Sequence, residues 1–133
     1  MQENDRAVRS DLDAHDYVVG LPVREVVREL TQLLGATTVA AIGGVKETRA
    51  VQQWMVDRDP QRPHVLRFAL QIALMLASQG DREFAQAWFH AANPRLEDRI
   101  PMLLLRDLPL VEIQRPLLAA ARAFGTRSET ASG

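Results

Sequence analysis

The chain has 133 residues, of which 47% are hydrophobic, so it is long enough for one compact domain with a hydrophobic core. Its 16 basic and 17 acidic residues nearly cancel, so any contact with DNA must come from a local patch. The absence of cysteine excludes disulfides, thiol catalysis and zinc-finger chemistry and is typical of a reducing cytoplasm. Because no apolar run approaches a membrane span and the polar N-terminus does not resemble a signal peptide, we expect a soluble, cytoplasmic protein with no membrane partner.

The first 16 residues are polar and acidic. They hold too few apolar side chains to offset the entropy of ordering them, so we expect residues 1–16 to form a flexible acidic arm. Four side chains of the types that bind metals stand close together there: Asp11, Asp13, His15 and Asp16. A divalent ion needs ligands held in a defined geometry, which a flexible arm does not supply. We therefore interpret this cluster as solvated and expect no metal site.

Three helices are predicted in the rest of the N-terminal half. The first runs from Pro22 towards Gly35, with apolar residues at helical spacing between them. A short helix follows and ends at Gly43-Gly44, and a polar-faced helix is then predicted over roughly residues 46–56. A support helix, a glycine turn and a polar-faced helix, in this order, are typical of a DNA-binding helix-turn-helix.

If the polar-faced helix enters a major groove, its side chains contact DNA. Those expected to reach base edges or phosphates are Lys46, Thr48, Arg49, Gln52, Gln53 and Arg58. A modest basic excess surrounds them, since Lys46, Arg49, Arg58, Arg62 and Arg67 outnumber Glu47, Asp57 and Asp59. The alternative is an ordinary helical hairpin whose polar face is solvated.

The C-terminal half begins with the most apolar segment of the chain. Residues 66–76 are apolar around most of a helix circumference, which predicts a central buried helix. Asp81 caps a following helix, and the final helix is predicted to reach Phe124, where Gly125 stops it and leaves a flexible tail over residues 125–133. With no alternating strand pattern, the chain is predicted to be all-α with six or seven helices.

Residues 88–105 contain two helix stops and one restart. Pro94 disfavours the helical conformation at Asn93, so a helix should close there, and Pro101 has the φ angle suited to the first position of a new helix. The charged residues between the two prolines form a short elbow. Apolar and aromatic residues surround this elbow beside arginines, a composition found at interface hot spots. The same residues could be the second half of the core.

No pattern in the sequence predicts catalysis. His64 and His90 are isolated, whereas a general base needs a neighbour and a cleft. The chain has no phosphate loop, nucleophile elbow or paired-carboxylate signature. We therefore expect a protein that is not an enzyme, has no catalytic residues and needs no cofactor.

The pattern around the elbow resembles the Xre/MbcA/ParS antitoxins. Their toxin-binding domain has an aromatic helix end, an Asn-Pro pair, a leucine, and a later proline before two leucines. The corresponding residues here are Trp88, Asn93, Pro94, Leu96, Pro101, Leu103 and Leu104. The resemblance covers roughly residues 22–124, because the helix-turn-helix lies where the family carries its Xre-like unit. The chain departs from the family at Glu97-Asp98, where a glycine is often found, and at Gly43, where an apolar residue is usual.

The resemblance implies an antitoxin of a type II toxin-antitoxin system, with an Xre-like helix-turn-helix region over residues 17–62 and a helical toxin-binding domain over residues 63–124. Such a protein dimerises and forms a hetero-oligomer with a RES-domain toxin, an enzyme that destroys NAD, and thereby neutralises it. It also represses its own operon by binding operator DNA. The residues expected at the toxin-binding site are Trp88, Asn93, Pro94, Arg95, Leu96, Arg99 and Pro101. The alternative is a stand-alone helix-turn-helix transcription regulator without a toxin partner.

Overall fold

The computed structural model describes the backbone of residues 12–132 and the side chains of residues 12–123. A helical segment at residues 12–19 is followed by α2 (Val23–Leu34), α3 (Ala36–Ile42), α4 (Thr48–Trp54), α5 (Pro63–Ala77), α6 (Arg82–His90), the 3-10 helix η1 (Pro94–Leu96), α7 (Pro101–Asp107) and α8 (Leu110–Ser132). The described part of the chain is thus all-helical, as predicted, with more helices than the six or seven expected.

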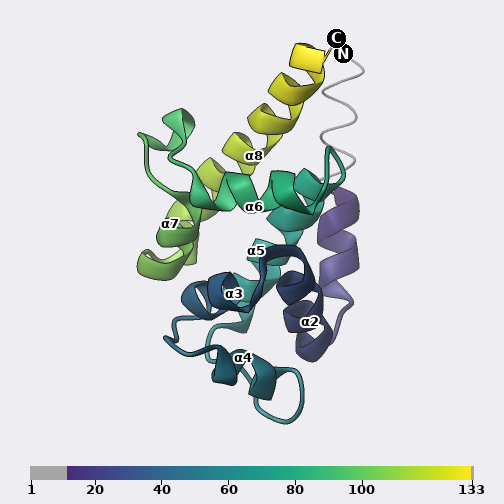
Figure 1. Cartoon of the computed structure of the whole chain (residues 1–133), viewed down its shortest axis with the longest axis vertical. Helices are drawn as coiled ribbons and strands as arrows, with labels where there is room; N and C mark the ends of the chain where they lie inside the picture. The colour runs from purple at the N-terminus through teal and green to yellow at the C-terminus, as the bar shows by residue number, and fades with distance from the viewer. Residues whose placement is uncertain (1–11, 133) are drawn as a thin grey trace.

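The central position of α5 follows from its composition. Leu66, Ala69, Leu70 and Ile72 are fully buried, and the helix contacts α2, α3, α6 and α8. Pro63 occupies the first turn of α5, where its missing N–H costs no helical hydrogen bond. Figure 1 shows α5 passing through the middle of the molecule, with α4 at one end and α8 at the other.

The hydrophobic core is continuous along the chain. Buried residues of α2 and α3 belong to the same cluster as those of α5, α6, α7 and α8. The expected boundary between residues 62 and 63 therefore does not coincide with a break in packing. The two regions share one core, and each helps to hold the other in place.

The helical segment at residues 12–19 corrects part of the flexible-arm prediction. Ala14 and Val18 are buried, 7% and 3% exposed, four residues apart on the inner face. The guanidinium of Arg67 in α5 donates hydrogen bonds of 3.0 and 2.7 Å to the carbonyl oxygens of Val18 and Leu21. Residues 12–16 are thus ordered by packing that their local composition does not reveal. Residues 1–11, the rest of the predicted arm, lie outside the described residues.

The ends of α2 agree with the sequence prediction, whereas the end of α8 does not. Pro22 and Gly35 flank α2, and Gly35 has the positive φ of 87° that glycine adopts readily. The backbone of α8 continues through Gly125 to Ser132, so the prediction that this glycine stops the helix is wrong. A glycine lowers helix stability but ends a helix only where the chain turns away.

In the part of the chain that the structure describes, no helix combines the length and the apolar character needed to cross a membrane.

Candidate partner-binding and DNA-binding surfaces

The elbow between α6 and α7 is organised by Asn93. Its side-chain Oδ1 accepts a hydrogen bond of 2.9 Å from the backbone N–H of Arg95, which caps η1. Its backbone carbonyl accepts from the N–H groups of Leu96 and Asp98, both at 2.9 Å, and its own N–H donates to the carbonyl of Arg99 at 3.1 Å. Asn93 and Arg99 form an isolated antiparallel bridge. These four bonds close residues 93–99 into a cross-braced loop.

The helices on both sides of the elbow begin and end close to the expected positions. Pro101 stands in the first turn of α7, as its fixed φ predicts. α6 ends at His90, before Asn93, because Ala91 already has extended backbone angles. Asn93 therefore begins the next element rather than closing α6.

Two residues of the elbow adopt left-handed backbone angles that disfavour most side chains. Glu97 has a φ of 58° and Asp98 a φ of 62°. These are the positions at which the antitoxin family often has a glycine, the residue best suited to that conformation. The chain accepts backbone strain at this turn, and the cross-bracing by Asn93 holds it there.

The residues expected at a toxin divide into a buried and an exposed group. Trp88 and Leu96 are 2% and 1% exposed and Pro101 is buried, so these three support the elbow from the core. Pro94 and Arg95 are exposed and Asn93 is half-buried. Arg99 is exposed, yet its Nε donates a hydrogen bond of 2.9 Å to the Leu96 carbonyl, which braces the turn. Pro94 and Arg95 are therefore the members of the set that are free to touch a partner.

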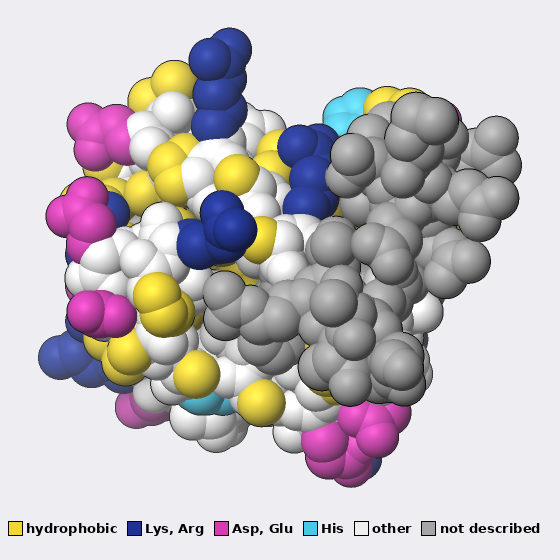
Figure 2. Space-filling model, turned by 90° about the horizontal axis from the view of Figure 1, so that it is seen from above, with side chains coloured by type: hydrophobic (Ala, Val, Ile, Leu, Met, Phe, Trp, Pro, Cys, Tyr) yellow, Lys and Arg dark blue, Asp and Glu magenta, His cyan; other side chains and the backbone are white. Residues whose placement is uncertain are grey.

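Two hollows flank the elbow. One, of about 160 Å³, is lined by Ala87, Trp88, Ala91, Ala92, Asn93, Pro94, Arg95, Ala120 and Ala123 and is called here the alanine hollow. The other, of about 440 Å³, is lined by Asp98, Arg99, Ile100, Leu103, Leu104, Asp107 and Leu108 and lies against α7. Both combine an apolar floor with a charged rim. Figure 2, which views this end of the molecule from above, shows hydrophobic atoms exposed between separate basic and acidic side chains.

One buried donor beside the elbow lacks an acceptor. The Nε1 atom of Trp88 has less than 1 Å² of exposed surface and no hydrogen-bond partner among the described residues. The indole ring packs edge to face against Phe89, with ring centroids 5.2 Å apart. A buried N–H without an acceptor is uncommon and calls for an explanation.

The glycine turn between α3 and α4 is fitted to Trp54. A Cβ atom placed on Gly43 would lie 2.6 Å from Cη2 of the Trp54 ring, which is closer than atoms can pack. Trp54 and Val51 are buried at 5% and 0% exposure and anchor α4. The indole that lies against Gly43 therefore explains why a glycine stands at this position.

α4 lies at the end of the molecule opposite α8 (Figure 1), and most of its polar side chains are exposed. Of the six residues proposed to contact DNA, Gln53 is half-buried, and the exposed ones are Lys46, Thr48, Arg49, Gln52 and Arg58. The helix itself is shorter than predicted, Thr48–Trp54, so Lys46 precedes it and Arg58 follows in the loop. The arrangement presents these side chains on one exposed segment.

The basic excess counted along residues 46–67 is not gathered on the surface of α4. Arg62 and Arg67 use their guanidinium groups on backbone carbonyls inside the molecule and do not join this surface. Lys46, Arg49 and Arg58 then stand against an equal number of acids, Glu47, Asp57 and Asp59. Any affinity for DNA must come from particular side-chain contacts and not from net positive charge.

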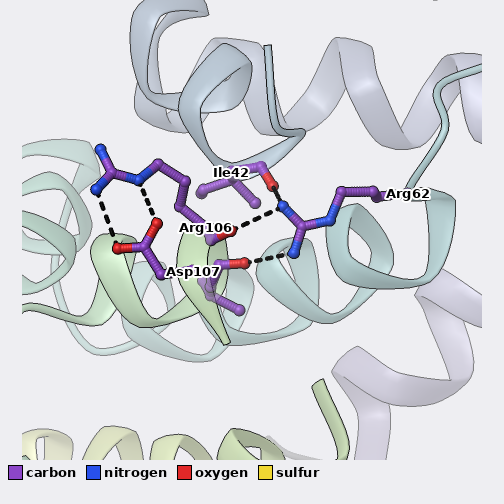
Figure 3. A network of polar contacts seen from close by, with 5 residues as sticks. Ile42, Arg62, Arg106 and Asp107 are labelled. Atoms are coloured by element: carbon purple, nitrogen blue, oxygen red, sulfur yellow. Dashed lines mark hydrogen bonds and ion pairs between the residues drawn. The ribbon is translucent and has the colours of Figure 1, made fainter. Parts of the chain in front are cut away.

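Arg62 joins the two halves of the molecule, a role that no sequence pattern indicates. Its Nη1 donates hydrogen bonds of 3.1 Å to the carbonyls of Ile42 and Arg106, and its Nη2 donates one of 2.9 Å to the carbonyl of Leu105 (Figure 3). These carbonyls belong to the last turns of α3 and α7, where helical carbonyls lack partners and attract positive charge. A cation at this point satisfies both helix ends at once.

Two further side-chain contacts lie at the ends of α6 and α7. Thr38 Oγ1 in α3 lies 3.0 Å from His90 Nε2 at the end of α6, which places this histidine in a structural hydrogen bond. At the end of α7, Arg106 makes two hydrogen bonds to the carboxylate of Asp107, at 2.7 and 3.0 Å. The hydrogen bond from Arg106, helped by the nearby charges of Arg106 and Arg62 and opposed by desolvation, lowers the pKa of the Asp107 carboxyl.

Among the residues that the structure describes, no group of three or more histidine, aspartate or glutamate side chains is placed to hold a metal ion. Comparisons of the chain with protein-family models, with curated proteins and with solved structures found no match.

Proposed function

We propose that this protein is the antitoxin of a type II toxin-antitoxin system. In this proposal it binds and neutralises a RES-domain, NAD-degrading toxin through the surface around the elbow, and it represses its own operon through α4. The resemblance of Trp88, Asn93-Pro94, Leu96, Pro101 and Leu103-Leu104 to the antitoxin pattern is the basis of this proposal.

The observation that supports it best is the construction of the elbow. Four hydrogen bonds centred on Asn93 fix the loop, so little conformational entropy is lost when a partner binds it. Pro94, Arg95 and Asp98 are exposed on the fixed loop, between two hollows with apolar floors. Rigid exposed charges around apolar recesses are a common design for a protein-binding surface.

The DNA-binding part of the proposal rests on α3 and α4. Trp54 locks α4 against Gly43, and Arg49, Gln52 and Lys46 are exposed along the resulting segment. Arginine and glutamine side chains can read base edges, whereas lysine contacts phosphates. The balanced local charge predicts that binding is weak away from the cognate site.

Co-purification tests the toxin-binding part. The chain is co-expressed with the RES-domain protein encoded beside it, and the complex is measured by native mass. We expect a stable hetero-oligomer, and an Arg95→Glu variant whose affinity for the toxin is weaker by about tenfold or more because charge complementarity is reversed. The matched control is Arg115→Glu on the exposed face of α8, which should bind as the parent does. Failure of the parent protein to form a complex would contradict the proposal.

The DNA-binding part is tested with a fragment from upstream of the gene. Arg49→Ala should weaken binding of the parent protein to this fragment, while Arg115→Ala should not, and the affinity should fall as salt rises. Binding to DNA without any binding to a RES-domain protein would favour a stand-alone transcription regulator. No salt-dependent binding would remove the DNA-binding role and leave toxin binding to stand or fall separately.

A further inference from the structure

The alanine hollow has the size and lining of a pocket for a single side chain. Its volume of about 160 Å³ is close to that of an engineered protein cavity that binds benzene, about 150 Å³. Ala87, Ala91 and Ala92 on one side and Ala120 and Ala123 of α8 on the other form most of its wall. Five small apolar side chains leave space that leucine or phenylalanine would fill.

Trp88, which lines the hollow, carries a buried hydrogen-bond donor without an acceptor. Its side chain lines the hollow, is 2% exposed, and carries the indole N–H that has no acceptor within the described residues. The free energy lost by burying this donor is recovered if a bound molecule supplies an acceptor. Because less than 1 Å² of the nitrogen is exposed, such a contact requires a small movement of the surrounding side chains.

The charge at the rim selects what can enter. Arg95 is exposed beside the hollow, and among the residues that the structure describes no acidic side chain lines it. The Arg95 backbone N–H is held by Asn93, which fixes where the side chain begins. A molecule with an apolar part and a carboxylate therefore matches the hollow, whereas a cation does not.

We propose that the alanine hollow receives one apolar side chain of the protein partner, with a neighbouring carboxylate of the partner against Arg95 and a peptide carbonyl accepting from the Trp88 indole N–H. This inference rests on the proposed function, because it assumes a protein partner at the elbow. It adds the chemistry of the partner residue that enters the hollow, called here the anchor residue. This is an aliphatic or aromatic residue next to an acidic residue or a chain end.

A small probe tests this chemistry without the partner. N-acetyl-leucine, which carries an apolar side chain and a carboxylate, is titrated into the ¹⁵N-labelled full chain at neutral pH. The chain has two tryptophans and thus two indole N–H signals, so Trp54 serves as an internal control for Trp88. We expect a saturable shift of the Trp88 signal alone. No shift, or an equal shift of both signals, would overturn the inference.

An altered probe and three variants separate the apolar from the charged contribution to probe binding. N-acetyl-leucine amide lacks the carboxylate, and Arg95→Gln lacks the guanidinium, so each should weaken probe binding by about fivefold, the effect of one exposed ion pair. Ala91→Leu and Ala92→Leu fill the hollow from exposed positions and should abolish binding. The remaining amide signals show whether each variant is folded. Equal binding of the amide, or unchanged binding by both filled variants, would contradict the proposal.

The partner itself distinguishes this inference from the proposed function. If the parent chain binds the RES-domain protein and the filled variants bind it equally well, no anchor residue occupies the alanine hollow, while the antitoxin function stands. If the parent chain shifts its Trp88 signal with the probe but binds no RES-domain protein, the antitoxin function is wrong and the ligand chemistry of the hollow is supported. Loss of toxin binding in both filled variants supports the two together.

Discussion

Arg62 and Leu105, 43 positions apart in the chain, are joined by a hydrogen bond of 2.9 Å from the arginine guanidinium to the leucine carbonyl. The same guanidinium binds the carbonyl of Ile42, so α3, which supports the proposed DNA-binding helix, is held against α7, which supports the elbow. One side chain at the start of α5 therefore adds to the shared hydrophobic core in holding the two proposed surfaces relative to each other.

The contribution of this side chain to stability is the first prediction. Arg62→Met keeps most of the apolar stem but removes three hydrogen bonds to helix C-terminal carbonyls, and we expect a loss of about 2 kcal/mol in the free energy of unfolding. Arg58→Met changes the same residue type at an exposed loop position and should stay within about 0.5 kcal/mol of the parent. Urea unfolding followed by circular dichroism measures both. Equal stability of the two variants would show that the Arg62 contacts contribute little.

The turn before α4 gives a prediction about packing. Gly43→Ala places a methyl group 2.6 Å from Cη2 of Trp54 and should destabilise the fold by about 1–3 kcal/mol, because the indole must move. Gly20→Ala is the control, since its nearest contact would be 3.8 Å away and its φ is not positive. Thermal unfolding and tryptophan fluorescence report the two effects. A Gly43→Ala protein with unchanged stability and fluorescence would mean that Trp54 does not pack on this glycine.

Backbone strain in the elbow predicts a stabilising substitution. Glu97→Gly relieves a φ of 58° and should raise the free energy of unfolding by about 0.5–1 kcal/mol. Glu83→Gly, at an exposed position in the first turn of α6, should lower it by about 1 kcal/mol because glycine disfavours a helix. The two substitutions are expected to change the free energy of unfolding in opposite directions. The general effect of glycine on the unfolded chain, which is the same for both, cannot produce this difference. Destabilisation by both substitutions would show that Glu97 is not strained.

The lowered pKa of the Asp107 carboxyl predicts that the free energy of unfolding changes with pH. Its pKa is lower in the folded protein than the ordinary value of 3.8, mainly because Arg106 hydrogen-bonds the carboxylate. The stabilisation is therefore complete above the unfolded pKa and is lost as the pH falls through the folded pKa. The difference in the free energy of unfolding between the parent and Asp107→Asn should therefore decrease as the pH is lowered from about 5 to about 2. A difference that is constant with pH, measured by urea unfolding, would contradict this, and Asp59→Asn provides the exposed control.

The parts of the fold that were predicted correctly depend on neighbours in the chain. Apolar spacing and the flanking Pro22 and Gly35 define α2, and the fixed φ of Pro101 defines the start of α7. The helical segment at residues 12–19 is held instead by the burial of Ala14 and Val18 and by Arg67, which is far away in sequence and donates to backbone carbonyls that any residue could supply. Backbone acceptors leave no trace in the amino-acid sequence, so neither this contact nor the role of Arg62 could be predicted.

The sequence predicted which residues gather at the candidate site but not which of them are buried. The residues around Asn93 do come together, yet whether Trp88 and Leu96 support the surface or form it depends on how α8 covers them. The apolar pattern of residues 88–105 is compatible with both. Burial assigns Trp88 and Leu96 to the core and leaves Pro94 and Arg95 outside.

The most direct test of the antitoxin proposal is cell growth and NAD content when the neighbouring RES-domain protein is induced. With the full chain co-expressed, growth should continue and NAD should stay at the level of uninduced cells. Arg49→Ala, on the opposite surface from the elbow, should protect equally well once expression is set by an external promoter. Growth arrest with NAD loss in the presence of the folded parent chain would contradict the account.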